Sequence, residues 1–350
     1  MVYLFFIVGL IMLLTGAELL VSSSSKVALR YGLSPILIGI TIVAFATSAP
    51  EIAVSVDAAI AEQSTLAIGN VLGSNMANIL LVLGLSAMLS PVAISRRIVR
   101  LDIPIMIGIT AVVYVLSLDN SISQFDGFIL LAIFVAFMIF QVKQARKENI
   151  LKEREPKIEP GSKPLWVQIL WFLIGLALLV IGADFLVENG VTIARTWGMS
   201  ELVIGLTIIA IGTSLPEVAT SVLAAYRGEQ DLSVGNIIGS NIFNLLLVLG
   251  LSSVISGSGL VVPDSSLVFD FPFLLAVSIA CLPIFFTGFR IARWEGAVFL
   301  AYYIAYLFFL FLESTEHDLL YEFSFAMSIF VIPITVLTLM VLVYRFWKKE

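Results

Sequence analysis

The sequence predicts an all-α polytopic membrane protein, built from two inverted five-helix repeats plus one extra C-terminal helix. Three observations lead to this fold class. The first is composition: 60% of the 350 residues are hydrophobic and 13% are charged, whereas soluble domains are about half apolar and a quarter charged. The second is a pair of motifs that occurs twice. The third is the distribution of Lys and Arg among the connecting segments.

Long apolar segments predict about 11 transmembrane helices. Each is long enough to cross a hydrocarbon core of about 30 Å as a helix, the form in which every backbone polar group is satisfied within the segment. The expected spans are 2–22, 34–60, 66–90, 99–117, 126–142, 165–187, 201–226, 232–256, 267–287, 294–312 and 323–344.

The spans group into two repeats with a polar connection between them. Residues 1–142 form the first five-helix repeat, and 165–312 form the second. The cytoplasmic linker 143–164 carries mixed charges and internal prolines, which is typical of a solvated connection. Residues 313–350 supply an outer loop and an accessory transmembrane helix.

Basic residues predict the orientation, because Lys and Arg concentrate in cytoplasmic loops. If the chain starts outside, every Lys and Arg except Arg195 falls on the cytoplasmic side. The outer connections are instead acidic. We therefore expect an N-out, C-in protein of the cell (inner) membrane.

The duplicated motifs lie in corresponding spans of the two halves. Residues 41–51 read TIVAFATSAPE and 207–217 read TIIAIGTSLPE; GNVLGSNMANILLVLGLS follows from Gly69 and GNIIGSNIFNLLLVLGLS from Gly235. An odd number of spans separates the copies, so they cross the membrane in opposite directions. Such inverted repeats are typical of secondary transporters with one central site.

Each copy places a glutamate, Glu51 or Glu217, near the middle of a span. On insertion scales such a charge costs about 2.5 to 3.5 kcal/mol, so a matched pair indicates function. Helical spacing puts further oxygen-bearing groups on the same face. These are Ala44, Thr47 and Ser48 in the first copy, and Ala210, Thr213 and Ser214 in the second.

Proline in each motif adds backbone oxygens. Pro50 and Pro216 have no N–H to donate, so each helix should loosen there and free carbonyls for an ion. An all-oxygen set suits hard cations such as Ca²⁺ and Na⁺. No cysteine or histidine lies nearby to indicate zinc or copper.

Spans three and eight carry polar residues at four-residue spacing, Asn70, Ser74 and Asn78 in one and Asn236, Ser240 and Asn244 in the other. We interpret Ser74 and Ser240 as ligands. For Asn70 and Asn236, helix packing and ion binding both remain open. The neighbouring GxxxG glycines allow close helix packing.

The paired segments resemble the two alpha repeats of the cation/calcium exchanger superfamily, at 37–90 and 203–256, and the chain resembles its prokaryotic sodium/calcium exchanger branch. The resemblance implies a calcium/sodium antiporter with Glu51 and Glu217 as the acidic ligands. It further implies that the backbone carbonyls of Ala44 and Ala210 are ligands. The implied side-chain ligands are Thr47, Ser48, Ser74 and Asn78 in the first half and Thr213, Ser214, Ser240 and Asn244 in the second. It also implies about three Na⁺ per Ca²⁺ and sliding of the first and sixth spans.

The expected function is exchange of Na⁺ for Ca²⁺ by alternating access, with H⁺ as a possible competitor for the carboxylates. A Ca²⁺/H⁺ exchanger, a K⁺-dependent exchanger and a cation channel are the alternatives. Asn244 counts against K⁺ coupling, because the K⁺-dependent branch resembles a form with aspartate there. An enzyme is not expected, since the chain lacks HExxH, paired intramembrane aspartates and a serine with a base. We expect no cofactor, and the sequence leaves the oligomeric state open, with a monomer plausible.

Overall fold

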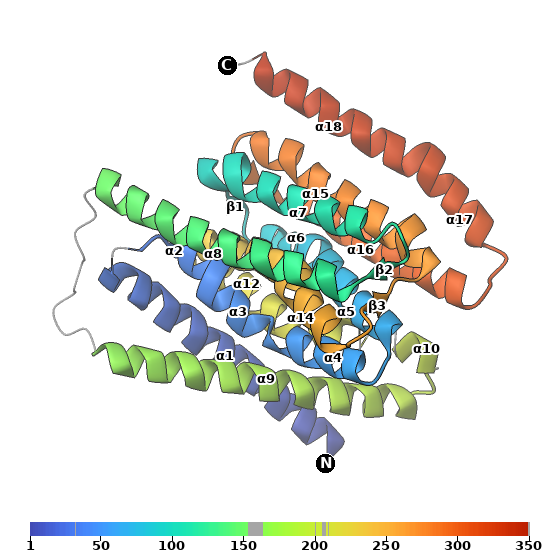
Figure 1. Cartoon of the computed structure of the whole chain (residues 1–350), viewed down its shortest axis with the longest axis horizontal. Coiled ribbons are helices and arrows are strands. Elements are labelled where there is room, and N and C mark those ends of the chain that lie inside the picture. The colour runs from blue at the N-terminus through green and yellow to red at the C-terminus, as the bar shows by residue number, and fades with distance from the viewer. Residues whose placement is uncertain (32, 153–163, 200, 205–207, 209, 349–350) are drawn as a thin grey trace.

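A computed structural model describes the whole chain except residues 32, 153–163, 200, 205–207, 209 and 349–350 (Figure 1). The described elements are almost all helical. Several helices contain one π-helical turn, labelled η. In the first half the elements are α1 (Val2–Tyr31), α2 (Pro35–Ile38), η1 (Gly39–Val43), α3 (Ala44–Thr47), α4 (Ala49–Ile60), α5 (Ser64–Met76), η2 (Ala77–Val82), α6 (Leu83–Leu89), β1 (Val92–Ala93), η3 (Ile98–Asp102), α7 (Ile103–Leu116), β2 (Ser121–Ile122) and α8 (Gln124–Lys152).

The second half repeats this order. Its elements are α9 (Leu165–Thr196), α10 (Glu201–Ile204), α11 (Ala210–Gly212), α12 (Leu215–Tyr226), α13 (Gln230–Phe243), η5 (Asn244–Val248), α14 (Leu249–Ile255), β3 (Leu260–Val261), η6 (Ser266–Asp270), α15 (Phe271–Phe286), β4 (Arg290–Ile291) and α16 (Arg293–Ser314). The accessory segment follows as α17 (Leu320–Ala326), η7 (Met327–Val331) and α18 (Ile332–Trp347).

Within the described residues, nine helices are long and apolar enough to cross a membrane, and the bent pair 35–47 with 49–60 makes a tenth. These ten correspond to ten of the expected spans. The remaining one, 201–226, includes residues outside the described set. Helix α8 continues to Lys152, so the expected linker begins as helix.

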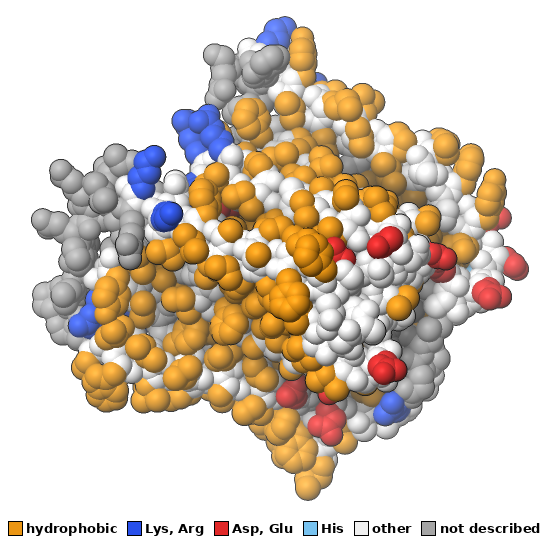
Figure 2. Space-filling view, in the orientation of Figure 1, with side chains coloured by type: hydrophobic (Ala, Val, Ile, Leu, Met, Phe, Trp, Pro, Cys, Tyr) orange, Lys and Arg blue, Asp and Glu red, His pale blue; other side chains and the backbone are white. Residues whose placement is uncertain are grey.

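One central helix from each half forms the core. In α5–η2–α6 and in α13–η5–α14, 83% of an 18-residue apolar stretch is buried inside the protein, whereas none of the corresponding stretch in the accessory segment is buried. The other spans surround these two helices. Hydrophobic side chains cover much of the outer surface (Figure 2), as expected where lipid rather than water surrounds the protein.

Helices α1 and α9 lie side by side and run antiparallel (Figure 1). Glycines make the contact possible. A Cβ at Gly9 would lie 3.0 Å from the carbonyl oxygen of Gly182, and one at Gly16 would lie 2.7 Å from that of Gly175. Since α1 and α9 open the two repeats, their antiparallel packing shows that the halves are inverted relative to each other.

Two small antiparallel sheets join the halves. Strand β1 pairs with β4, with Val92 opposite Ile291, and β2 pairs with β3, with Ile122 opposite Leu260. The repeat relates β1 to β3 and β2 to β4, so each sheet takes one strand from each half. The sequence did not predict these strands. Two residues are too few for an alternating apolar pattern.

Lys and Arg gather toward the left of the view in Figure 2, while most Asp and Glu lie toward the right. This separation agrees with the charge pattern used for orientation. Which end faces the cytoplasm stays a prediction.

Candidate functional site

Both motif helices break at a serine two residues before the proline. Ser48, between α3 and α4, has φ −81° and ψ 5°, and the helix bends by 46° there. Ser214 precedes α12 with nearly the same angles, φ −84° and ψ 1°. The break expected from Pro50 and Pro216 is therefore present in both halves, displaced slightly toward the N-terminus.

Each break starts a new helix with a glutamate in its first turn, Glu51 in α4 and Glu217 in α12. The first backbone N–H groups of a helix have no intrahelical acceptor and carry partial positive charge. A carboxylate is favoured at this position even within a membrane. Both side chains are completely buried, and they interact electrostatically with each other.

Glu217 is bound by hydroxyl groups from both halves. Its Oε1 accepts hydrogen bonds from Ser48 Oγ at 3.3 Å and from Ser240 Oγ at 3.4 Å. Its Oε2 has no hydrogen-bond partner among the described residues. Thr47 extends the cluster, with its Oγ1 3.4 Å from Ser240 Oγ. Residues far apart in the sequence therefore meet around one carboxylate.

Glu51 has a less complete set of partners. Ser74 Oγ donates to its Oε1 at 3.5 Å, and its Oε2 has no partner in the described part of the chain. Ser214, the counterpart of Ser48, is fully buried, and its hydroxyl likewise has no described partner. The two halves are thus not identical in detail.

Two asparagines orient the threonines across the interface between the halves. Asn236 Oδ1 accepts a hydrogen bond from Thr47 Oγ1 at 3.2 Å, and Asn70 Oδ1 accepts one from Thr213 Oγ1 at 3.4 Å. Helix packing and ion binding by Asn70 and Asn236 stay open, and the structure adds a role that the sequence did not predict. Their side chains hold the threonines in place.

A serine fixes each asparagine in turn. Asn70 Nδ2 donates to Ser55 Oγ at 2.9 Å, and Asn236 Nδ2 donates to Ser221 Oγ at the same distance. Sequence reasoning missed these serines. The available signal was a serine four residues after the motif glutamate in both halves, one helical turn further along the same face.

Asn78 is the second residue of the π-helical turn η2, and Asn244 is the first residue of η5. Both are buried, and neither the amide oxygen nor the amide nitrogen of either residue has a partner among the described residues. Buried polar groups are seldom left in this state, since each unpaired group costs about 1 to 3 kcal/mol. Their oxygens are free to coordinate a cation.

The two expected backbone ligands are only partly described. The Ala44 carbonyl accepts the N–H of Ser48 at 2.9 Å and the hydroxyl of Thr47 at 3.4 Å. Ala210 is the first residue of α11, and its side chain lies outside the described set.

The structure therefore brings Thr47, Ser48, Ser240 and Glu217 together in the core, with Ser74 beside Glu51. Unsatisfied oxygens remain on Glu51, Glu217, Asn78, Asn244 and Ser214. Among the described residues, no group of three His, Cys, Asp or Glu side chains is arranged so that it could hold a metal ion. A cation here would depend on hydroxyl, amide and carbonyl oxygens besides the two carboxylates, a donor set that suits hard cations.

Two inverted halves that share one buried, oxygen-rich cluster have the architecture of a secondary transporter. A family model for the sodium/calcium exchanger protein matches residues 1–143 and 167–312. The chain belongs to this family, and it is a multi-pass membrane antiporter for cations including Ca²⁺.

Individual relatives agree. The chain is 41% identical over 315 residues to the putative antiporter CaxA of Alkalimonas amylolytica, covering 88% of this chain and 98% of that protein. It is 33% identical to the sodium/calcium exchanger MaX1 of Methanosarcina acetivorans, with the same coverage. A solved structure of the sodium-calcium exchanger NCX_Mj, soaked with Na⁺ and Sr²⁺, matches with TM-score 0.75 and 31% identity over 87% of this chain and 96% of that one.

Proposed function

We propose that this protein exchanges Na⁺ for Ca²⁺ at one central site built on Glu51 and Glu217. The observation that supports this most directly is the hydrogen bond from Ser48 of the first half to Glu217 of the second, at 3.3 Å. A site shared in this way lies where the two halves meet, so helices that move past this interface can open it toward one side of the membrane at a time, as alternating access requires.

Charge explains how two different ions use the same groups. Two ionised carboxylates carry a charge of about −2, which one Ca²⁺ neutralises and which several Na⁺ also offset. Both ions need the same oxygens, so binding of one excludes the other. A proton competes for the same carboxylates, and acid should therefore inhibit exchange.

The ligands we propose are the twelve residues named from the sequence. The described contacts support direct roles for the two glutamates, Ser48, Ser74 and Ser240, whose polar atoms meet within hydrogen-bond distance. Asn78 and Asn244 are supported by buried amides without described partners. Thr47 and Thr213 are held by Asn236 and Asn70, while Ser214 contributes an unpaired hydroxyl and Ala44 and Ala210 contribute carbonyl oxygens.

We further propose a stoichiometry of about three Na⁺ per Ca²⁺. Each cycle would then move one net charge, and the membrane potential would contribute about 2.3 kcal/mol per 100 mV. A current that accompanies Ca²⁺ flux in proteoliposomes is the expected result. Flux without current would contradict this stoichiometry.

The decisive assay is ⁴⁵Ca²⁺ uptake into proteoliposomes under separate Na⁺, K⁺ and H⁺ gradients. We expect uptake with an outward Na⁺ gradient alone. Uptake driven only by a pH gradient would identify a Ca²⁺/H⁺ exchanger, and a requirement for K⁺ would identify the K⁺-dependent class. Single-channel currents would indicate a channel.

Substitutions test the site itself. Glu51→Gln and Glu217→Gln should each abolish Na⁺-dependent Ca²⁺ uptake while leaving the protein folded. Asp57→Asn is the matched control, because it removes the same charge from the same helix, α4, at an exposed position. Normal uptake by either glutamine variant would refute the proposed site.

A further inference from the structure

The accessory segment α17–η7–α18 lies outside the family match, which ends at residue 312. It packs against α15 and α16 over a limited part of its length, and α18 lies apart from the other helices in Figure 1. The segment therefore belongs to this chain in addition to the exchanger core. Its contact with that core is incomplete.

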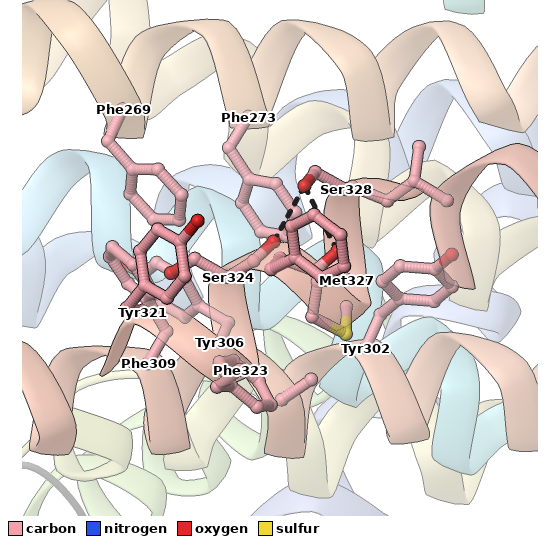
Figure 3. Close-up of a pocket in the computed structure, with 13 residues that line it drawn as sticks. Phe269, Phe273, Tyr302, Tyr306, Phe309, Tyr321, Phe323, Ser324, Met327 and Ser328 are labelled. Atoms are coloured by element: carbon pink, nitrogen blue, oxygen red, sulfur yellow. Dashed lines mark hydrogen bonds between the residues drawn. The ribbon is translucent and has the colours of Figure 1, made fainter. Parts of the chain in front are cut away.

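A cavity of about 460 Å³ separates the accessory segment from the core. This volume falls within the usual range for small-molecule sites, about 300 to 1,000 Å³. Figure 3 shows the rings of Phe269 and Phe273 on one side, with Tyr321 and Met327 of the accessory segment opposite them. Aromatic stacking stiffens the core side, where the Phe269 and Phe309 ring centroids are 4.1 Å apart.

The polar groups at this cavity are largely occupied within the protein. Tyr302 OH donates to Thr335 Oγ1 at 2.7 Å, and Tyr306 OH donates to Asp270 Oδ1 at 3.3 Å. Ser328 Oγ donates to the Ser324 carbonyl at 2.7 Å (Figure 3). A ligand would therefore meet rings and alkyl groups, which suit a hydrocarbon chain and offer little to a polar molecule.

A second cavity, of about 240 Å³, continues along the same helix interface. It shares Phe273, Tyr302 and Ile332 with the first. We refer to the two neighbouring cavities together as the cleft; both are lined by residues of the accessory segment and of the core. An elongated occupant fits this shape.

Acidic side chains gather where α16 leads into the accessory segment. Four exposed carboxylates lie in or beside this α16–α17 connection: Glu313 near the end of α16, Glu316 and Asp318 between the helices, and Glu322 in α17, next to the cavity residues Tyr321 and Phe323. The sequence has no Lys or Arg between Arg293 and Arg345, so no basic side chain of this stretch offsets them. This connection attracts an ammonium group and repels a headgroup with net negative charge.

We propose that this cleft, lined by residues of α15, α16 and the accessory segment, binds the acyl chain of a phospholipid whose headgroup carries an ammonium group. The acyl chain of the lipid lies against the aromatic side of the cleft, and the ammonium group of its headgroup meets the carboxylates of the α16–α17 connection. The accessory helix thus attaches to the core partly through a bound lipid.

Native mass spectrometry of the full chain tests the selectivity. The purified protein is mixed with equal amounts of phosphatidylethanolamine and phosphatidylglycerol that have identical tails. We expect phosphatidylethanolamine adducts to exceed phosphatidylglycerol adducts severalfold. Neutralising the carboxylates of the connection with Glu313→Gln, Glu316→Gln, Asp318→Asn and Glu322→Gln should make the amounts of the two lipid adducts equal. A preference for phosphatidylglycerol in the unaltered protein would overturn the proposal.

Filling the cavity tests the site. The double variant Ala305→Phe/Ser324→Phe adds two rings to the cavity lining and should lose most adducts, whereas Leu337→Phe, at an exposed position outside both cavities, should keep them. Ca²⁺ uptake by the double variant checks its fold. Unchanged adducts in a transport-competent double variant would contradict the site.

Photo-crosslinking of the unaltered protein gives an independent answer. Phosphatidylethanolamine with a diazirine near the middle of its tail should label peptides that contain Phe269, Phe273 or residues 321–328. Labelling confined to other peptides would exclude this cleft. A dimer held through the accessory helix, seen as a doubled mass without lipid, would show that a second copy fills it.

Discussion

Thr47 of the first half donates its hydroxyl proton to Oδ1 of Asn236 of the second half, at 3.2 Å. The equivalent bond from Thr213 to Asn70 is 3.4 Å long. Each threonine thus depends for its orientation on the half to which it does not belong. An ion held by these hydroxyls would respond to the relative position of the two halves.

Substituting these asparagines should weaken ion binding without removing a charge. Asn236→Ala and Asn70→Ala each remove, along with a bond to a serine, the hydrogen bond that orients a threonine. That one bond is worth about 0.5 to 1.5 kcal/mol, so the apparent Ca²⁺ affinity should fall by up to about tenfold. The measurement is the Ca²⁺ concentration dependence of uptake. Asn75→Ala is the control, because Asn75 bonds to the backbone of Asn241 instead. An equal loss of apparent Ca²⁺ affinity in all three variants would argue against a specific role of Asn70 and Asn236 in orienting the threonines.

Helices α1 and α9 pack so closely that there should be no room for a side chain at the glycines of their interface. At Gly16, a Cβ would lie 2.7 Å from the Gly175 carbonyl oxygen. Gly16→Ala should therefore separate the helices at a cost of about 1 to 3 kcal/mol and lower the Tm. Gly108→Ala is the matched control, since no described atom lies within 4 Å of a Cβ there. Similar Tm values for the two variants would mean that α1 and α9 are free to spread apart.

A buried charge network at the start of α7 should be important for stability. Gln141 Nε2 donates to Asp102 Oδ1 at 3.0 Å, and Arg97 Nε lies 3.5 Å from Asp102 Oδ2. Asp102 is completely buried. Asp102→Ala leaves the Arg97 charge without this carboxylate, a change that typically costs about 3 to 5 kcal/mol. Thermal unfolding should show a large fall in Tm.

The control for that substitution is an ion pair with more solvent exposure. Arg227 Nη2 lies 2.5 Å from Glu18 Oε2, but the two side chains are 47% and 36% exposed. Exposed pairs contribute about 0 to 1 kcal/mol. Arg227→Ala should therefore change the Tm little. A larger effect for Arg227 than for Asp102 would reverse our view of which pair stabilises the fold.

Much of the fold was predictable because the membrane restricts the choices. Long apolar runs have to be helices, and the repeated TSAPE and TSLPE segments predicted two equivalent helices with a break in each. The proline explained the break, although the structure places it at Ser48 and Ser214. The serines and glutamates of the candidate site could be named from the sequence because polar groups are exceptional in an apolar segment.

What escaped prediction depends on contacts between distant segments. The roles of Asn70 and Asn236 became clear only when Thr213 and Thr47 of the opposite half were placed beside them. The Asp102–Gln141 bond joins residues of different helices, with no local pattern that pairs them. The two-residue strands are too short to leave a periodic signal.

Those small strands have a mechanical consequence. Each sheet ties a connection of one half to a connection of the other, through Val92 with Ile291 and Ile122 with Leu260. The strands thus connect the central helices of one half to those of the other. No strand is next to α1 or α9 in the described chain, and these two helices contact each other at their glycines. The sheets therefore join the helices that hold the candidate site, and the sliding of the first and sixth spans, which the family resemblance implies, stays a prediction for α1 and α9.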